Sequence, residues 1–203
     1  VADDGSGEAT RRVVDAFRDR LPVPLVHVWQ PDEGYRLAQI RNRATAAARG
    51  RYVIQVDGDL VLHRDFVRDH LDAARPGYFV GGSRVLLGPD ASRRVLAGAM
   101  RPGPFASGVR NRENALHLAW LGRLLARWIR PTAISRVRGA NMSYWRDDFL
   151  AVNGYDEAYV GWGREDTDLV VRLHCFGLER RYFKLQGIVY HLDHADRARD
   201  RLG

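Results

Sequence analysis

One feature limits the folds open to this chain more than any other: the apolar run Tyr52–Val56, which ends abruptly in the acidic turn Asp57-Gly58-Asp59. β-Branched and aromatic residues dominate the run, as they do in buried β-strands. Open α/β sheets bind their ligands at the carboxyl ends of such strands. Gly58 lets the backbone turn sharply, so that both carboxylates can reach one hard cation. Acid-Gly-acid turns are also common in surface loops, and this stretch alone leaves both interpretations open.

Strand and helix patterns alternate on both sides of that run. Helical spacing occurs over residues 10–20, 35–48 and 65–74, and strand patterns over 25–29, 78–87, 181–185 and 187–191. The alternation predicts a parallel sheet with helical crossovers. Val1–Ser6 reads as the end of a strand running into a turn, and we therefore expect this chain to lack the first strand of the fold together with its natural amino terminus. Residues 89–108, rich in Gly, Pro and Arg, are expected to form a loop.

Composition narrows the class of protein. The 203 residues, 45% of them hydrophobic, suffice for one globular domain with its own core. No apolar run approaches the ~18–20 residues of a membrane span. The single cysteine, Cys175, excludes an intramolecular disulfide and fits a reducing compartment. The net charge of +7 suits nucleic acid, anionic lipid or a nucleoside diphosphate as partner. Because no nucleic-acid motif is present, we expect no nucleic-acid partner.

The strongest helical pattern covers residues 111–129. Leu116, Trp120, Leu124 and Trp128 follow one another at i+4 steps, and several arginines occupy other faces. The interpretation we favour is a helix packed on the core of the domain. The alternative is an interfacial helix that lies on anionic lipid or holds a lipid-linked acceptor.

Two later stretches carry groups suited to chemistry. Gly161-Trp162-Gly163 stands just before Glu165 and Asp166, where a helix begins. The helix dipole favours acidic residues there without any function. A tryptophan between two glycines also suits stacking on a sugar ring, and a carboxylate beside it can act as a general base. His191 ends an apolar strand and could complete a metal site begun by Asp59, although such a histidine is more often structural.

A zinc interpretation follows from the spacing of His191 and His194. A His-x-x-His pair without further Cys or His ligands is weak evidence for zinc. The metal ion therefore stays open at this point.

Taken in order, these pieces resemble family 2 glycosyltransferases of the GT-A fold. The motifs that carry the likeness are Asp3–Ser6, Trp29-Gln30, Asp32–Arg36, Ile40–Asn42, Asp57–Asp59, Arg138–Ser143, Asn153–Asp156, Gly161–Gly163 with Glu165-Asp166, and His191. The likeness is strongest to the subgroup resembling a domain of bacterial chondroitin polymerase, and it is more distant to β-1,4-galactosyltransferases. It implies a three-layer α/β sandwich with a mostly parallel central sheet.

The resemblance also divides the chain and assigns roles. It implies a nucleotide-sugar-binding half at 1–88, a variable loop plus amphipathic helix at 89–136, an acceptor and catalytic half at 137–194, and a tail at 195–203. The residues implied near the nucleotide sugar are Asp3, Asp4, Arg36, Arg41, Asp57 and Asp59. Those implied to hold Mn²⁺ or Mg²⁺ are Asp59, His191 and Asp57, and those implied to face the acceptor or sugar are Trp162, Gly163 and Asn141. Asp166 is implied as the catalytic base, with Glu165 beside it.

The function implied is metal-dependent, inverting transfer of a sugar from a UDP-sugar to a glycan, polysaccharide or lipid-linked saccharide, such as a bacterial surface polysaccharide or lipopolysaccharide. Such an enzyme is expected in the cytoplasm or at the inner face of the membrane, with peripheral contact through residues 111–130. Three alternatives remain. One is a glycoside hydrolase using Glu165, which would not need the metal set. The others are a non-catalytic basic module that binds an anionic polymer, and an inactive, truncated glycosyltransferase.

Overall fold

The computed structural model describes residues 1–131, 137–161 and 163–194. The strands form three hydrogen-bonded groups. They are β1 (Ala2–Asp4) with β2 (Val28–Gln30); β3 (Tyr52–Val56), β8 (Asn141–Trp145), β5 (Tyr78–Gly81) and β9 (Glu179–Arg181) in that order; and β4 (Leu60–Leu62), β10 (Val189–His191), β6 (Val85–Leu87) and β7 (Val109–Arg110) in that order.

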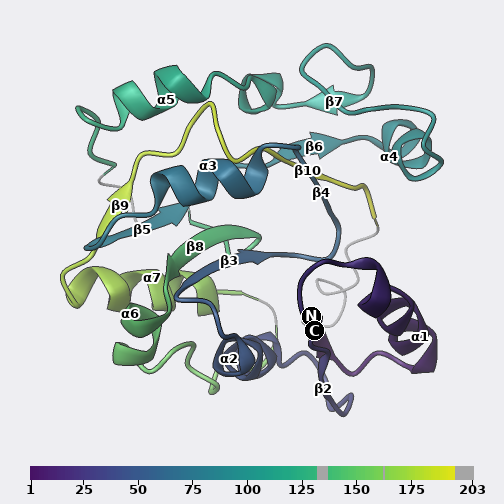
Figure 1. The fold of residues 1–203 in the computed structure, drawn as a ribbon, viewed down its shortest axis with the longest axis vertical. Helices are drawn as coiled ribbons and strands as arrows, with labels where there is room; N and C mark the ends of the chain where they lie inside the picture. The colour runs from purple at the N-terminus through teal and green to yellow at the C-terminus, as the bar shows by residue number, and fades with distance from the viewer. Residues whose placement is uncertain (132–136, 162, 195–203) are drawn as a thin grey trace.

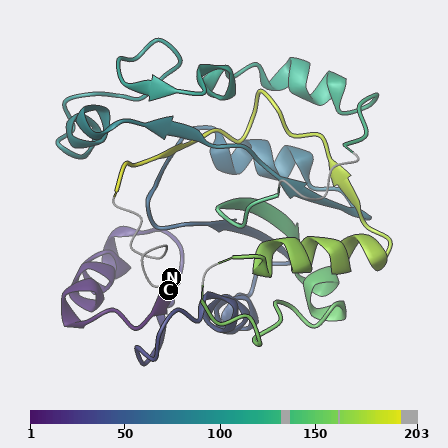
Figure 2. The same cartoon turned by 180° about the vertical axis from the view of Figure 1, so that it is seen from behind.

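Helices cover both faces of these strands. They are α1 (Glu8–Ala16), α2 (Leu37–Ala47), α3 (Phe66–Ala73), α4 (Pro89–Leu96), α5 (Ala119–Leu125), α6 (Arg146–Ala151) and α7 (Glu165–Cys175), with 3₁₀ turns at Arg18–Arg20 and Arg112–Ala115. In both views of the ribbon, α2, α6 and α7 lie on one side of the sheet that contains β3 and β8, and α3 and α5 lie on the other (Figures 1 and 2). The predicted three-layer α/β architecture is therefore confirmed.

Strand directions are mixed rather than mostly parallel. β1–β2, β5–β9 and β6–β10 are parallel, whereas β8 runs antiparallel to both of its neighbours and β4 runs antiparallel to β10. β8 occupies the centre of its sheet although it comes late in the chain, and local periodicity does not reveal that insertion. The register of β8 places the start of this strand beside the end of β3. Val56 pairs with Asn141, so the carboxyl end of β3 lies next to the segment that leads into β8.

The main core lies between the β8 sheet and α7. Its large members include Phe79, Met142, Tyr144, Phe149, Tyr155, Leu169 and Leu173. β3 confirms the predicted strand, but it is only half-buried and Val56 is 39% exposed, because β3 is an edge strand of its sheet. The strand pattern over 78–87 is divided into β5 and β6, because β5 ends at Gly81 and β6 begins at Val85. A Cβ on Gly82 would overlap the Asn141 amide, which explains the need for glycine.

Two sequence expectations about residues 89–130 are wrong. The expected loop contains α4, which begins at Pro89, a residue whose fixed φ suits the first turn of a helix. The long helix expected over 111–129 is reduced to α5 and a 3₁₀ turn. In α5 the residue that faces the interior is Gly122, where a Cβ would overlap the carbonyl oxygen of Lys184.

Because Gly122 is on the inner face of α5, the large side chains of the apolar stripe lie on the outer face. Trp120 is 64% exposed and Trp128, just beyond α5, is 80% exposed. The core-packing interpretation of this apolar stripe is therefore wrong. Within the described ranges no helix combines the length and apolar character needed to cross a membrane.

Candidate active site

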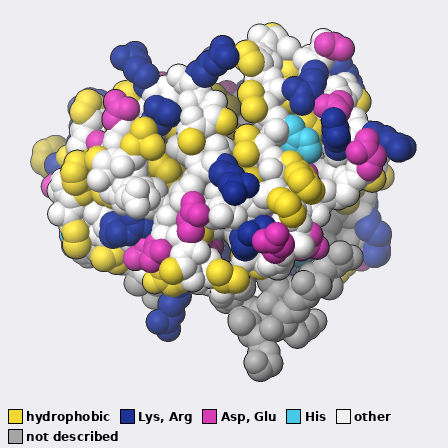
Figure 3. All heavy atoms as spheres, turned by 90° about the horizontal axis from the view of Figure 1, so that it is seen from below, with side chains coloured by type: hydrophobic (Ala, Val, Ile, Leu, Met, Phe, Trp, Pro, Cys, Tyr) yellow, Lys and Arg dark blue, Asp and Glu magenta, His cyan; other side chains and the backbone are white. Residues whose placement is uncertain are grey.

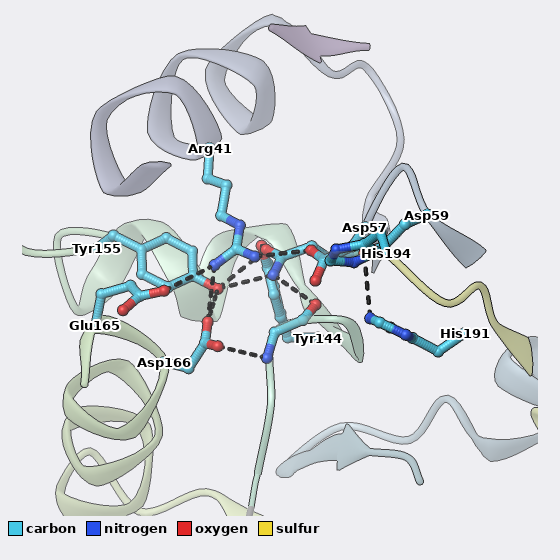
Figure 4. A network of polar contacts seen from close by, with 11 residues as sticks. Arg41, Asp57, Asp59, Tyr144, Tyr155, Glu165, Asp166, His191 and His194 are labelled. Atoms are coloured by element: carbon cyan, nitrogen blue, oxygen red, sulfur yellow. Dashed lines mark hydrogen bonds and ion pairs between the residues drawn. The ribbon is translucent and has the colours of Figure 1, made fainter. Parts of the chain in front are cut away.

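Arg41 of α2 connects three carboxylates that come from distant parts of the chain. Its Nη2 lies 2.9 Å from Oδ1 of Asp57, and its Nη1 lies 2.8 Å from Oδ1 of Asp166 and 3.5 Å from Oε1 of Glu165. Asp57 directly follows β3, whereas Glu165 and Asp166 form the first turn of α7. Figure 4 shows the guanidinium pointing between these two elements. The structure thus brings together four residues that the sequence placed in the site.

Burial and charge shape the ionisation of this cluster. Burial alone would lower the pKa of Arg41, but Tyr155 and the three carboxylates raise it, so the guanidinium stays charged. Burial raises the pKa of Asp57 despite the opposing effect of Arg41. Burial, and then the charge of Asp166, raise the pKa of Glu165. One arginine among three carboxylates leaves an excess of negative charge, which favours a cation nearby.

Asp166 is held firmly on both oxygens. Its Oδ2 accepts a hydrogen bond of 2.7 Å from the Gly139 amide, and its Oδ1 accepts one of 3.3 Å from the Tyr155 hydroxyl in addition to the ion pair with Arg41. Gln55 of β3 donates to the Gly139 carbonyl at 2.8 Å and contacts the Tyr155 hydroxyl at 2.9 Å. A Cβ on Gly139 would overlap the Asp166 carboxylate. Only glycine therefore lets the chain before β8 approach this carboxylate so closely.

Asp59 forms a second cluster with two histidines. Its Oδ2 lies 3.1 Å from Nε2 of His191 and 2.8 Å from Nε2 of His194. Its Oδ1 is buried and has no hydrogen-bond partner. A buried carboxylate oxygen without a partner calls for an explanation, and one carboxylate with two imidazoles is a ligand set that suits a divalent metal ion. Burial lowers the pKa of His191, which keeps the imidazole neutral and able to ligate.

The pairing of β4 with β10 explains why these side chains meet. His191 is opposite Leu60 in the antiparallel register, and the Leu192 amide donates to the Asp59 carbonyl at 3.0 Å. The sequence assigned Asp59 and His191 to the metal and considered His194 only in the weak zinc interpretation. The signal for His194 was its three-residue spacing from His191. Asp57, also assigned to the metal, pairs instead with Arg41.

The residues assigned to the nucleotide divide into two groups. A pocket of about 380 Å³ is lined by Val1, Ala2, Leu37, Arg41, Val56 and Asp57, among others. Asp3, Asp4 and Arg36 are not among the lining residues. They contact other residues of the protein instead. Oδ2 of Asp3 lies 2.8 Å from Nε2 of His27, and Oδ2 of Asp4 accepts a 2.7 Å hydrogen bond from the Arg36 amide. Nη1 of Arg36 forms an ion pair with Oε2 of Glu33 at 2.7 Å.

The acceptor-side residues are separated as well. Trp162 lies outside the described residues. Gly163 has a φ of +108°, a conformation that favours glycine, just before α7. Asn141 is 2% exposed, and its amide donates to the carbonyls of Ser83 and Gly187 at 2.9 Å each. Its side chain therefore bonds within the interior of the sheet, and its predicted contact with an acceptor stays a prediction.

Sequence reasoning missed the groups that position Asp166. These are Gln55, Gly139, Tyr144 and Tyr155. Signals were present for three of them: Gln55 is the single polar side chain in an otherwise apolar strand, and Gly139 and Tyr155 lie in motifs that carry the family resemblance.

Comparisons with known proteins agree with this geometry. Residues 1–127 match the family model described as glycosyl transferase family 2, and residues 121–195 match the one described as the N-terminal domain of galactosyltransferase. Over 204 residues the chain is 31% identical to validoxylamine A glucosyltransferase of Streptomyces hygroscopicus subsp. jinggangensis (strain 5008), covering 88% of this chain and 44% of that protein. Over 195 residues it is 23% identical to chondroitin synthase of Escherichia coli, and the match covers 87% of this chain and 28% of that protein.

The fold has a match among solved structures. GalNAc-T7 with UDP, GalNAc and Mn²⁺ superposes with a TM-score of 0.63 at 14% identity, covering 96% of this chain and 37% of that one. This match confirms the predicted GT-A fold. The chain spans less than half the length of these curated relatives.

Proposed function

Because the chain belongs to glycosyltransferase family 2, we propose that it transfers a sugar from a nucleotide sugar, a UDP-sugar, to a hydroxyl group of a glycan, polysaccharide or lipid-linked saccharide. The observation that carries this proposal is the adjacency of two clusters. Asp59, with its unpartnered oxygen and two histidines, stands two residues from Asp57, which belongs to the Arg41 cluster and lines the pocket. The first cluster suits a cation and a diphosphate, and the second suits a proton transfer.

On the donor side, the nucleotide would occupy the pocket bordered by Arg41 and Asp57. Mn²⁺ or Mg²⁺ would be held by Asp59, His191 and His194. When bound, such an ion neutralises negative charge on a departing diphosphate. Arg41 would add a fixed positive charge at the same edge of the sheet, and such preorganised charge stabilises a developing anion.

On the acceptor side, Asp166 would act as the general base. It would remove the proton of the acceptor hydroxyl while that oxygen forms a bond to the anomeric carbon and the bond from this carbon to the diphosphate breaks. The single displacement inverts the anomeric carbon. The Gly139 amide and Arg41 support this role, because both hold the carboxylate in one orientation. Glu165, more buried and with a raised pKa, is suited to donate a hydrogen bond to a sugar hydroxyl.

The test is release of UDP from a panel of UDP-sugars with acceptor, in Mn²⁺ and in EDTA. Asp166→Asn keeps the shape of the side chain and removes the base, and we expect turnover to fall about 10²–10⁴-fold. Binding of UDP should stay near that of the wild type. The matched control is Asp168→Asn, a change in the same helix at a residue that pairs with Arg172 instead. An Asp166→Asn variant with wild-type turnover would show that another group is the base.

The alternatives predict different results in the same assay. A glycoside hydrolase would cleave glycosides in EDTA, whereas the proposed transfer needs the ion. A basic module would bind anionic polymers with strong salt dependence and release no UDP. On the face seen in Figure 3, arginines are interspersed with acidic and apolar side chains and do not form one positive patch, which gives that module little support.

The exposed stripe beside α5 supports a contact with anionic lipid. Trp120 and Trp128 project outward, and Arg123 and Arg127 stand between them in the sequence. Aromatic side chains flanked by basic ones are typical of surfaces that lie on anionic membranes. We propose that this surface brings the site to an acceptor carried on a lipid.

A further inference from the structure

A second cluster of metal-ligating side chains lies at the other end of β4, away from Asp59. It consists of His63, Asp65 and His117, whose ligand atoms all lie within 4.8 Å of one another. Asp59 directly precedes β4 and His63 directly follows it, so the strand separates the two clusters. The rings of His63 and His117 stack with their centroids 4.3 Å apart. Nothing in the proposed transfer uses these three residues.

The orientation of His117 is set by a buried carboxylate. Its Nε2 lies 2.9 Å from Oδ2 of Asp69, a residue that is 1% exposed and also accepts a 2.8 Å hydrogen bond from the Gly187 amide. A histidine that donates one ring N–H to a carboxylate has its tautomer fixed and its other nitrogen available as a ligand. This arrangement is typical of metal-binding histidines. Asp69 therefore leaves Nδ1 of His117 with a lone pair to offer.

The distance between the other two ligands fits a small ion. Nδ1 of His63 lies 3.7 Å from Oδ2 of Asp65. Two ligands at ~2.0–2.1 Å from a tetrahedral ion stand about 3.4 Å apart, so only a small movement is needed. Nδ1 of His63 also accepts a 3.2 Å hydrogen bond from the Asp65 amide, which the ion would replace. The competing cation is Arg64, 3.4 Å from Asp65, and its side chain is 89% exposed and free to move away.

The site is open enough for an ion to enter. The side chains of His63, Asp65 and His117 are 23%, 27% and 24% exposed, which leaves room for a water molecule as fourth ligand. Two imidazole nitrogens and one carboxylate oxygen suit Zn²⁺ and related transition-metal ions.

We propose that His63, Asp65 and His117 bind a zinc-class transition-metal ion, distinct from the ion at Asp59, that ties the segment before α5 to the end of β4. His117 is followed by Leu118, whose amide donates to the Leu185 carbonyl at 2.9 Å. The ion would thereby fasten two segments that are far apart in the sequence, and it would stabilise the loop that leads into β10. The argument is independent of the transferase proposal, because it rests on residues outside that site.

The experiment measures Zn²⁺ bound per chain by equilibrium dialysis of EDTA-stripped protein. The double variant Asp59→Asn/His194→Asn first removes two of the three ligands of the other cluster and leaves His191 alone there, and we expect it to retain one bound Zn²⁺. Adding His63→Ala, or separately Asp65→Asn, should abolish that binding. Asp65→Asn keeps the size of its side chain, so it guards against a loss that reflects misfolding. Circular dichroism in EDTA should be the same for all variants.

A second measurement tests whether the bound ion stabilises the segment that contains His117 and Leu118. Zn²⁺ should slow hydrogen exchange at the Leu118 amide in the double variant and have no effect once Asp65→Asn is added. The proposal is overturned if the double variant binds no Zn²⁺, or if it binds Zn²⁺ that both His63→Ala and Asp65→Asn leave in place.

Discussion

β4 and β10 carry a histidine–carboxylate cluster at each end, and the two clusters differ in what surrounds them. At one end Asp59 has a buried oxygen without a partner, and its charge reaches Asp57 of the Arg41 cluster, whose pKa it helps to raise. At the other end His117 is anchored by Asp69, which is bonded into the core through Gly187. The cluster at Asp59 thus lies beside the carboxylates of the Arg41 cluster and a pocket. The cluster at His117 lies beside buried, hydrogen-bonded residues of the core. The difference teaches that two similar ligand sets can be told apart by their neighbours, and these neighbours are the basis for proposing a catalytic role for the first cluster and a structural role for the second.

The largest expected effect comes from a matched pair of substitutions, one at each end. Asp59→Asn should lower Mn²⁺-dependent transfer at least about 100-fold, since the loss of an ion that stabilises the departing diphosphate costs several kcal/mol. Asp65→Asn, which makes the same chemical change at the other end, should leave the rate near that of the wild type. Initial rates at saturating donor, over a Mn²⁺ titration, measure both. Equal losses in the two variants would contradict the division of roles.

The next effect is on stability and not on rate, and it concerns the core that anchors the second end. His70 of α3 is fully buried between Ser143 at 2.7 Å and Asn141 at 3.0 Å, and burial lowers its pKa to about 4. The unfolded chain has the ordinary pKa of about 6.5, so it takes up the proton first as the pH falls. The free energy of unfolding is therefore highest above pH 6.5 and decreases as the pH falls toward 4. The decrease is about 3 kcal/mol, from about 2.5 pH units at about 1.36 kcal/mol each.

Urea unfolding of the wild type and of His70→Gln at several pH values measures this decrease. Glutamine stays neutral, so the variant should lack the part of the pH dependence that belongs to His70. Other groups contribute equally to both proteins, and the difference between the two curves isolates the histidine. Parallel curves from pH 7 to pH 4 would show that the pKa of His70 is the same in the folded and the unfolded chain.

The sequence predicted most of the first end and little of the second. Asp59 and Asp166 stand in short motifs at the end of a strand and the start of a helix, and Arg41 was assigned only through the resemblance to the family. The position of β8 was not predictable, because an antiparallel strand inserted from far along the chain leaves no local period. The meeting of His63 with His117 depends on where that distant segment packs. The shortening of the helix around Trp120 has the same origin, since contact between Gly122 and the loop at Lys184 decides which face is buried.

The smallest expected effect on the folded protein concerns the exposed stripe beside the second end. Trp120→Ser/Trp128→Ser removes side chains that are 64% and 80% exposed, so the free energy of unfolding should change by no more than about 0.5 kcal/mol per site. Transfer to an acceptor free in solution should not change either. Binding to vesicles that contain anionic lipid should weaken, because the stripe supplies the apolar part of that contact.

The control is Val13→Ser on α1, which removes an apolar group that is 60% exposed on another part of the molecule. Sedimentation with vesicles compares the two, and equal vesicle binding by the wild type and the tryptophan variant would exclude this surface as the membrane contact.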